Sequence, residues 1–389
     1  MRISKRSTLL LGVATAMLLA TSGCSNGLLA GDDAGSDESG TVKLAMVVPI
    51  SGPSAPTGEY MSNAAQLAVD EINDAGGVLD GRQLELLVED EACDAQQGVA
   101  SANKAVSAGA VVSVGGYCSG ATLPQLPIFE EANVPMIIPA ANSQDLVKAG
   151  KKNVFLVNGT GNQQSTAALK YMLKSGMTTV ALVDDNDSYA VDITTETNRL
   201  IEEDGTVTVA LATSVTPGES DYSAAVRDIM SANPELVYWT GYYQEGGLII
   251  NQLRNAGFEG KIMVADGSVD GSISEIAGAN AEGVLATMTQ TPDTLEGGDE
   301  WIANYEEAFD STPGPFSLQS YDAVRLAAHA IDEAGSTDGD AIIAALEAVD
   351  GFQMFSGPLT FTADHTLSSG GFVILSVQDG TFALEDDLS

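Results

Sequence analysis

The sequence is short of cysteine, histidine and basic residues, and each shortage excludes a class of site. Its 389 residues include only 3 Cys and 2 His. No two histidines stand at ligand spacing and no Cys-x-x-Cys occurs, so the sequence offers no metal-binding pattern. It also has no P-loop and no G-x-G-x-x-G after a predicted strand, the patterns that hold nucleotide phosphates. We therefore predict no cofactor and no metal site.

Basic residues are greatly outnumbered by acidic ones. Lys and Arg total 16 and Asp and Glu total 54, which gives a formal net charge of -38. Such an acidic chain repels nucleic acid and anionic lipid surfaces, so neither is an expected partner. The charge favours solubility, and adaptation to a saline habitat is a second interpretation that the sequence leaves open.

Long apolar runs are also missing. The run from Leu9 to Ala20 has about a dozen residues, whereas a membrane span needs ~20. It follows a basic start and precedes Thr21-Ser22-Gly23-Cys24. This order predicts a secretory signal peptide over residues 1–23. The small residues before Cys24 resemble a bacterial lipobox, which implies lipidation of Cys24 and anchoring to the cell membrane outside the cytoplasm. An ordinary signal peptide cleaved nearby is the alternative.

The segment after the signal differs from the rest of the chain. Residues 24–41 are rich in glycine, serine and acidic side chains, which predicts a flexible tether. The body that follows is long enough for two domains. With Cys24 lipidated, Cys93 and Cys118 are an isolated pair in an oxidising compartment. A bridge between them would close a loop of about 26 residues, worth ~3–4 kcal/mol on the chain-entropy model.

Short β-rich runs alternate with amphipathic helical segments along the body. This alternation is typical of parallel sheets covered by helices, and the strands are too many for one sheet, so we predict an α/β protein with two lobes. Strands are predicted over 42–49, 84–88, 110–114, 135–139, 178–183, 206–212, 235–239, 261–265, 358–361, 372–377 and 381–385, and helices over 61–73, 96–108, 165–175, 190–203, 222–232, 246–256, 301–309, 318–334 and 340–349.

The segment from Val111 to Gly120 gives the sharpest functional signal. A predicted strand ends there in glycines, and a polar cluster then opens a helix. Ligands bind at this carboxyl edge of open α/β sheets, and the amides of a helix N-terminus favour an anion. Ser119 adds a hydroxyl donor, so we predict a carboxylate site at Ser119. The alternative is that Ser119 only caps the helix.

Further loops after predicted strands carry polar or aromatic side chains. A zwitterion needs an anion site, a cation partner and an apolar wall, and these loops supply an amide, aromatic rings and one carboxylate. Because each loop follows a strand, we predict that they surround one ligand. The side chains are Asn142, Tyr189, Tyr242 and Asp266.

A different class of protein has to be weighed at the same segment. Gly116-Tyr-Cys-Ser-Gly120 has the spacing of a hydrolase elbow, with Cys118 as the nucleophile. Such an enzyme needs a histidine base, and neither His329 nor His365 stands in the expected context after a late strand. A bridge to Cys93 would also consume the thiol. We therefore predict a protein that is not an enzyme, and a reactive thiol at Cys118 would favour the alternative.

Taken together, the motifs resemble a known family. Over nearly all of residues 42–380 the chain is similar to the periplasmic branched-chain amino acid binding proteins of ABC transporters, the leucine/isoleucine/valine type. The motifs in family order are Ser51-Gly-Pro53, Ala68-Val-Asp-Glu-Ile-Asn73 with Gly76-Gly77, Asp90-Glu-Ala-Cys-Asp94, Cys118-Ser119, Val237-Tyr-Trp-Thr-Gly-Tyr-Tyr243, Ala281-Glu-Gly283 and Gly357-Pro358-Leu359.

The resemblance implies a type I periplasmic-binding-protein fold with two lobes and three hinge crossovers. Lobe 1 would comprise residues 42–158 plus 288–365, and lobe 2 residues 159–287 plus 366–389. The two lobes would close on the ligand like a Venus flytrap. The resemblance also implies a disulfide between Cys93 and Cys118, an ABC transporter permease as partner, and a monomer.

The resemblance further assigns roles to individual residues. Ser119 would hold the α-carboxylate of an amino acid, and Asp266 would pair with its α-ammonium. The loop with Ala140 and Asn142 would bind both groups. The whole implied ligand-binding set is Ser119, Ala140, Asn142, Tyr189, Tyr242 and Asp266.

The wall of the side-chain pocket departs from the family. Thr57 stands where an aromatic residue is common, and Tyr117 is larger than the usual aliphatic residue and would refill that space. Phe316 would border the same pocket. The expected ligand is a branched-chain or aliphatic amino acid. Another small zwitterion, an amide or an aromatic acid is the alternative, and so is a sensor on the same scaffold.

Overall fold

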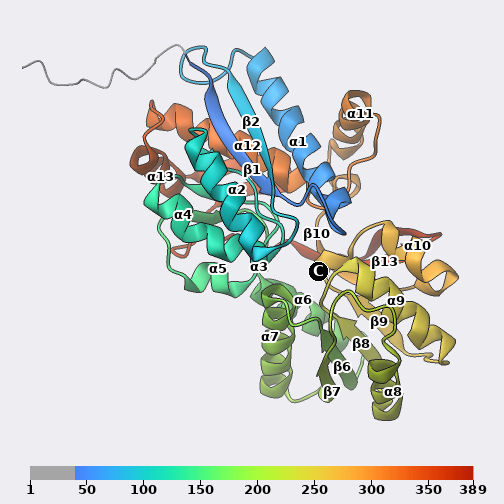
Figure 1. Ribbon diagram of the computed structural model, residues 1–389. Helices are drawn as coiled ribbons and strands as arrows, with labels where there is room; N and C mark the ends of the chain where they lie inside the picture. Colours follow the sequence, from blue (N-terminus) through green and yellow to red (C-terminus); the bar gives the residue numbers. More distant parts are fainter. Residues whose placement is uncertain (1–39, 389) are drawn as a thin grey trace, which may run out of the picture. The chain divides into compact units, whose positions relative to one another are not determined.

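The computed structural model describes residues 40–388 (Figure 1). The predicted signal peptide over residues 1–23, the lipidation site Cys24 and nearly all of the predicted tether over residues 24–41 lie outside this range. Within residues 40–388, none of the helices combines the length and the apolar character that crossing a bilayer requires.

The first sheet has five parallel strands in the order β2-β1-β3-β4-β5. Side chains of β1 alternate between its two faces, as the period of a strand requires. Leu44 and Met46 pack in one core, and Ala45 and Val47 pack in another on the opposite face. The strands are β1 Val42–Val48, β2 Leu84–Asp90, β3 Val112–Ser113, β4 Met136–Ile138 and β5 Val154–Leu156.

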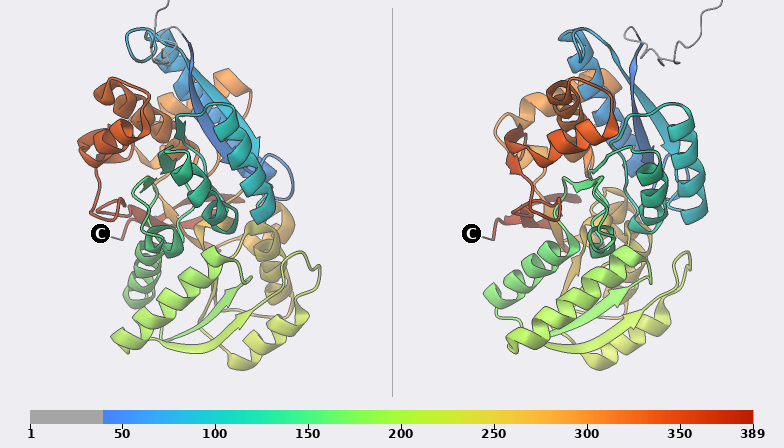
Figure 2. Two further views of the ribbon diagram at one scale, coloured as in Figure 1. Left: turned by 60° about the vertical axis from the view of Figure 1, so that its left-hand side comes forward. Right: turned by 90° about the vertical axis from the view of Figure 1, so that its left-hand side faces the viewer.

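Helices cover both faces of this sheet. Helices α1 and α12 lie side by side on one face, and α2 covers the other (Figures 1 and 2). Burying residues on both faces explains why β4 and β5 are entirely apolar, whereas the edge strand β2 carries three acidic residues. The helices of this part are α1 Ala55–Asp74, α2 Ala95–Ser107, α3 Ser119–Thr122, α4 Leu126–Glu131, α5 Gln144–Lys148, α11 Gly298–Phe309, α12 Ser317–Ala334 and α13 Gly339–Glu347.

The second sheet has seven strands in the order β14-β13-β10-β9-β8-β6-β7. Strands β6 to β10 run parallel, whereas β13 pairs antiparallel with both β10 and β14. The strands are β6 Thr179–Asp184, β7 Thr208–Ser214, β8 Leu236–Trp239, β9 Lys261–Val264, β10 Leu285–Thr289, β13 Phe372–Gln378 and β14 Thr381–Asp386, and a separate hairpin joins β11 Asp350–Met354 to β12 Gly357–Thr360.

Helices again cover the second sheet from both sides. Residues of α6 and α7 share a core with Leu182 and Tyr238, while residues of α8, α9 and α10 share another with Val183 and Trp239. These helices are α6 Gly161–Lys174, α7 Ser188–Asp204, α8 Ser223–Ala232, α9 Tyr243–Asn255 and α10 Ser272–Ala277.

The predicted α/β class with mostly parallel sheets is confirmed. Helix α1 begins at Ala55 rather than Met61, because Pro56 in its first turn has a suitable φ and needs no amide partner there. Strand β3 is only two residues long. Three strands were not predicted, namely β5, β10 and β11, because their runs are short or contain polar residues and glycine.

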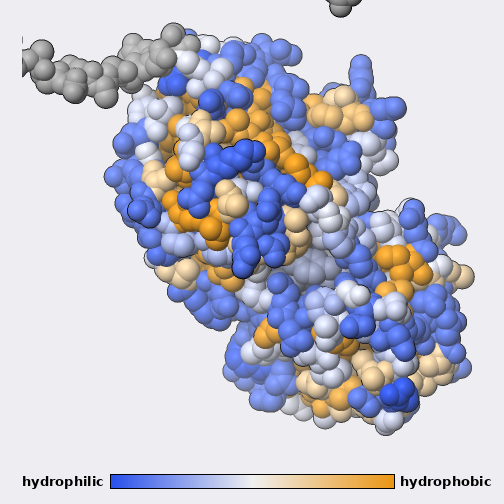
Figure 3. Space-filling view, in the orientation of Figure 1, coloured by the Kyte–Doolittle hydropathy of each residue, from blue (hydrophilic) through white to orange (hydrophobic). Residues whose placement is uncertain are grey.

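Hydrophilic residues predominate on the face drawn in Figure 3, with apolar residues among them. Large apolar side chains that are exposed include Ile50 and Leu384, each 45% accessible. Scattered apolar residues of this kind are ordinary for a protein surface.

Candidate ligand-binding site

The predicted site residues follow the carboxyl ends of strands from both sheets. Ser119 opens α3 after β3, and Ala140 and Asn142 follow β4. Tyr189 lies in the first turn of α7 after β6, and Asp266 opens a single 3-10 turn, Asp266–Ser268, after β9. Tyr242, which precedes α9, completes the set.

Asp266 is the centre of the hydrogen-bond network at this edge. Its side chain is buried, with 2% of the residue accessible. Tyr189 Oη donates to Asp266 Oδ1 over 2.6 Å, and Gln164 Nε2 donates to the same oxygen over 3.0 Å. Asn142 Nδ2 donates to Asp266 Oδ2 over 3.2 Å. The donors come from residues on both sides of the cleft, so this carboxyl group joins the two sheets' loops.

The partners of Asp266 are all neutral. Within residues 40–388, no lysine, arginine or histidine forms an ion pair with it. Burial raises the pKa of Asp266 to about 6, although the hydrogen bonds from Tyr189 and Gln164 oppose the shift. A buried carboxylate without a countercharge is costly. The site is therefore suited to a ligand that brings a positive charge.

Asn142 has an unused acceptor beside this carboxyl group. Its Nδ2 donates to Gln164 Oε1 over 3.0 Å as well as to Asp266. Its Oδ1 is buried and has no hydrogen-bond partner within the described chain. An ammonium group placed here would give Asn142 Oδ1 a donor and Asp266 a countercharge at once.

Ser119 does not cap α3 through its side chain. Cys118 is the N-cap residue, and no side-chain hydrogen bond caps the helix. Ser119 is fully buried, and its Oγ accepts a hydrogen bond from Ser143 N over 3.3 Å. This bond joins the loop after β3 to the loop after β4, so the two loops predicted to bind the carboxylate lie together.

Aromatic rings form a continuous wall beside the carboxyl group. The ring centres of Tyr189 and Tyr242 are 5.4 Å apart, those of Tyr242 and Tyr117 are 5.9 Å apart, and those of Tyr117 and Phe316 are 5.7 Å apart. Glycine at position 267 lets the two rings approach closely, because a Cβ there would lie 3.0 Å from the Tyr189 ring and 3.1 Å from that of Tyr242. The wall supplies the apolar surface that a zwitterion's carbon skeleton needs.

These rings and Asp266 enclose a small cavity. Its volume is about 10 Å³, which is room for about one water molecule. Ser119, Asn142 and Thr57 are buried as well, but they do not line this cavity. The lining residues are Tyr117, Ala140, Tyr189, Tyr242, Asp266, Gly267 and Phe316.

The cysteine pair lies directly behind the predicted carboxylate site. Cys93 and Cys118 form a disulfide, with Cα atoms 5.3 Å apart. Ligand atoms of Glu91, Cys93 and Cys118 lie within 4.8 Å of one another, but sulfurs in a disulfide are not thiolate ligands for a metal. The bonded Cys118 also has no thiol to act as a nucleophile, so the hydrolase alternative is wrong.

Both histidines are engaged elsewhere. The ring of His365 stacks on Phe155 at 4.2 Å, and its Nδ1 lies 3.1 Å from Val154 O. The ring of His329 packs against Phe352 at 5.1 Å. Neither histidine is bonded to Cys118 in the described structure, which is a second reason to reject a cysteine hydrolase.

Three residues of the site were missed by sequence reasoning. Gln164 lies in the first turns of α6, where a polar residue normally faces solvent, so nothing local marks its burial. Asp187 caps α7 and accepts a long 3.5 Å hydrogen bond from Tyr242 Oη. Glu91 is completely buried and accepts from Cys118 N and Gln125 Nε2. Because Asp90 stands next to Glu91 in the sequence, the two residues have the pattern of solvent-exposed carboxylates.

The strand ends of the two sheets meet around a buried carboxyl group and an aromatic wall. This arrangement is that of a solute-binding protein. The family model described as periplasmic binding protein matches residues 41–381. The chain belongs to this family, in its branched-chain amino acid, type I branch. It is therefore a binding component of transport and not an enzyme, and the family is an extracytoplasmic one.

The chain is similar to named relatives and to solved structures over most of its length. The chain is 33% identical over 335 residues to the leucine-, isoleucine-, valine-, threonine- and alanine-binding protein of Pseudomonas aeruginosa, covering 86% of this chain and 89% of that protein. A leucine-binding protein LivK from Thermotoga maritima has a TM-score of 0.82 at 27% identity, covering 89% of this chain and 98% of the other. The LivJ protein of Streptococcus pneumoniae, solved with isoleucine, has a TM-score of 0.81 at 26% identity, covering 89% and 99%.

Proposed function

We propose that this protein is the solute-binding lipoprotein of an ABC importer, and that it binds an aliphatic α-amino acid between two lobes that close on it. The observation that carries the proposal is the buried carboxyl group of Asp266, which accepts hydrogen bonds from neutral side chains and has no countercharge in the described structure. An α-ammonium group supplies that charge. The relatives named for leucine, isoleucine and valine support the choice of an amino acid.

The two charged ends of the ligand are held by different segments. Ser119 Oγ and the loop carrying Ala140 and Asn142 bind the α-carboxylate through a hydroxyl group and backbone amides. Asp266 and Asn142 Oδ1 bind the α-ammonium. Fixed donors at one end and a fixed anion at the other select a zwitterion over a simple acid or amine.

The carbon skeleton then faces the aromatic wall. Tyr189 and Tyr242 come from the segments around the second sheet, and Tyr117 comes from those around the first. Tyr117 and Phe316, with Thr57 behind them, form the side-chain end of the site. Closing the two sides buries apolar ligand surface at ~25 cal/mol per Å².

Hydrogen bonds between the two proposed lobes, outside the ligand site, support closure. Tyr243 Oη and Gln244 Nε2 both donate to Pro53 O, over 2.5 and 2.8 Å. Gln144 N donates to Asp192 Oδ2 over 2.9 Å. These bonds form only when the sides meet, so they favour the closed form once a ligand neutralises Asp266.

The hinge consists of three crossovers, at residues 157–160, 287–290 and 361–371. Parts of all three line one cavity of about 280 Å³. Gln163 Nε2 donates to Leu367 O over 3.1 Å, and Gln319 Nε2 donates to Thr289 Oγ1 over 3.0 Å. Crossovers that lie together permit the lobes, 42–158 plus 288–365 and 159–287 plus 366–389, to rotate as rigid bodies.

A thermal-shift screen tests the ligand class. The chain without its first 23 residues is heated with each of the twenty amino acids, small amides and aromatic acids. A ligand at 100 times its Kd adds about 2.7 kcal/mol of stability. Aliphatic amino acids raise Tm and their des-amino acids do not. If only aromatic acids or amides raise Tm, the amino acid assignment is wrong.

Anchoring and the transport partner have their own test. Cys24→Ala moves the protein from the membrane fraction to the soluble extracytoplasmic fraction, whereas the unchanged protein stays in the membrane fraction. There we expect it to be a lipidated monomer that delivers its ligand to the permease. An unchanged distribution contradicts the lipid anchor.

A further inference from the structure

The side-chain end of the site is closed by one residue of the loop between β3 and α3. Tyr117 is 6% accessible, and its ring lies 5.9 Å from Tyr242 and 5.7 Å from Phe316. The ring therefore fills the space between the segment after β8 and the start of α12. A ligand side chain that extends from Asp266 along the aromatic wall meets this ring.

Tyr117 is held on its backbone side by several fixed contacts. Its neighbour Cys118 is bonded to Cys93, and the Cys118 amide donates to the buried Glu91 over 3.3 Å. Gly116 before it has φ of +113°, and a Cβ there would lie 3.2 Å from both Ile138 and Thr122. The backbone of Tyr117 cannot retreat from the cavity without disturbing these packed groups.

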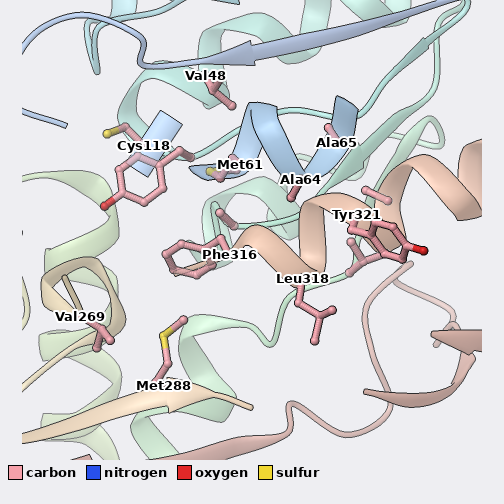
Figure 4. Packing of buried hydrophobic residues seen from close by; sticks show 14 of the residues in the cluster. Val48, Met61, Ala64, Ala65, Cys118, Val269, Met288, Phe316, Leu318 and Tyr321 are labelled. Atoms are coloured by element: carbon pink, nitrogen blue, oxygen red, sulfur yellow. The ribbon is translucent and has the colours of Figure 1, made fainter. Parts of the chain in front are cut away.

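The ring of Tyr117 is fixed as well. It packs between the rings of Tyr242 and Phe316 and is buried. Phe316 supports the ring edge-on while holding a left-handed backbone conformation, with φ of +63°. A bulky residue in that conformation persists only where its surroundings enforce it. Figure 4 shows Phe316 pointing from α12 toward the side where Cys118 and Val269 lie.

When the hydrogen bonds between the two proposed lobes are formed, very little space remains in front of Tyr117. The cavity of about 10 Å³ admits about one water molecule, so any ligand must part the two sides. The bonds from Tyr243 and Gln244 to Pro53 and from Gln144 to Asp192 tolerate only a small separation. Each further carbon of a ligand side chain widens the gap and weakens them.

We propose that Tyr117 is a specificity-determining residue that limits the ligand to α-amino acids with a short side chain, of the size of glycine, alanine or serine. The inference rests on the proposed binding of an amino acid and narrows its substrate class. Leucine and isoleucine would press on a ring that has no free space behind it. A pocket discriminates by about 10- to 200-fold for one excess methylene group.

Calorimetric titration of the chain from residue 24 onward with L-alanine and with L-leucine tests this inference. The unchanged protein binds alanine at least about tenfold more tightly than leucine. Tyr117→Leu replaces the ring by a smaller side chain and raises the ratio of leucine affinity to alanine affinity by about tenfold or more. Tyr117→Phe keeps the ring and keeps the preference of the unchanged protein, which separates ring size from the hydroxyl group.

The contrary outcomes are distinct. Leucine binding as tight as alanine binding in the unchanged protein overturns the inference, and so does an unaltered leucine-to-alanine ratio in Tyr117→Leu. The comparison of alanine with leucine in the unchanged protein needs no variant, so it tests the inference even if the Tyr117→Leu protein does not fold. If a folded protein with a cooperative thermal transition binds neither amino acid, the proposed function itself fails, and this inference fails with it.

Discussion

Asn142 Nδ2 donates a hydrogen bond to Asp266 Oδ2 over 3.2 Å and so joins the loop after β4 of the first sheet to the turn after β9 of the second. The amide lies beside the carboxyl group with which the proposed ligand ammonium would pair. It supplies a neutral donor where the carboxyl group has no countercharge. The closed arrangement without a ligand therefore depends in part on this one bond.

Replacing Asn142 tests that dependence. Asn142→Ala removes a hydrogen bond to an ionisable group, worth about 1.5–3 kcal/mol. We expect the unliganded variant to populate an open form more, which small-angle scattering detects as a larger radius of gyration. Asn198→Ala, which removes an exposed bond to Glu202 on α7, is the control and leaves scattering unchanged. Identical scattering of the Asn142 variant and the unchanged protein would show that the bond does not hold the sides together.

The affinity for an amino acid should depend on pH through Asp266. Burial raises the pKa of Asp266 to about 6, and the ammonium group of a ligand pairs only with the ionised carboxylate. Affinity therefore falls as the pH is lowered from 8 to 5, approaching about tenfold per pH unit below the pKa. Calorimetry at several pH values measures this slope, and a flat profile contradicts the ion pair.

The stability of the unliganded protein should change in the opposite direction. A carboxyl group with a raised pKa contributes stability below its ordinary pKa and loses it as the pH rises through about 6. Burial shifts the pKa of Asp185 and of Asp322 to about 6 as well, so their contributions have the same sign. The Tm of the unliganded protein thus decreases between pH 4 and pH 7 from these groups.

Glu91 should cost stability at neutral and higher pH. Burial raises the pKa of this completely buried carboxyl group to about 8, and its hydrogen bonds from Cys118 N and Gln125 Nε2 only partly oppose the shift. Because the contribution of Glu91 is lost as the pH rises through 8, Glu91→Gln stabilises the protein by roughly 4 kcal/mol at pH 8 and by less than about 1 kcal/mol at pH 5.

Urea denaturation at the two pH values measures the effect of Glu91→Gln. Glu89→Gln is the matched control, since Glu89 forms an ion pair with an exposed Lys104 and should change stability by less than about 1 kcal/mol. A Glu91 variant that is destabilised equally at both pH values would mean that hydrogen bonding at this position outweighs its charge.

The disulfide should contribute through the loop that it closes. Cys93 and Cys118 are separated by 25 positions, and cross-linking a loop of this length is worth ~3–4 kcal/mol. We expect the double variant Cys93→Ser, Cys118→Ser to lose about that much free energy of unfolding, and a reductant to destabilise the unchanged protein to the same extent. No difference in denaturation midpoint would show that packing alone fixes this loop.

Much of the fold follows from local patterns. Strands such as β1 are apolar except at one position, Lys43, so the α/β alternation was predictable. Short or mixed runs were not, as β10 illustrates: Leu285–Thr289 alternates threonines with apolar residues, and its pairing with β13 depends on a segment more than 80 residues away in the chain.

The site divides in the same way. The positions of Asp266 and Tyr189 at the edge of the second sheet were predictable because both lie in segments that follow strands. Gln164 was not, because its burial against Asp266 and Thr287 arises only from the packing of α6 on the second sheet. Glu91 was also missed, since nothing in the run Asp90-Glu91 distinguishes a carboxyl group on the surface from one beneath Cys118.

The central claim is that a ligand ammonium group pairs with the buried carboxylate of Asp266, and calorimetric titration of Asp266→Asn with L-alanine and L-leucine at pH 7.5 tests it most directly. Asparagine preserves the size of the side chain but cannot carry the charge, so folding is retained. Losing one partner of a buried ion pair costs about 3–5 kcal/mol, and we therefore expect affinity to fall by roughly two orders of magnitude or more. Affinity within about threefold of that of the unchanged protein would contradict the account.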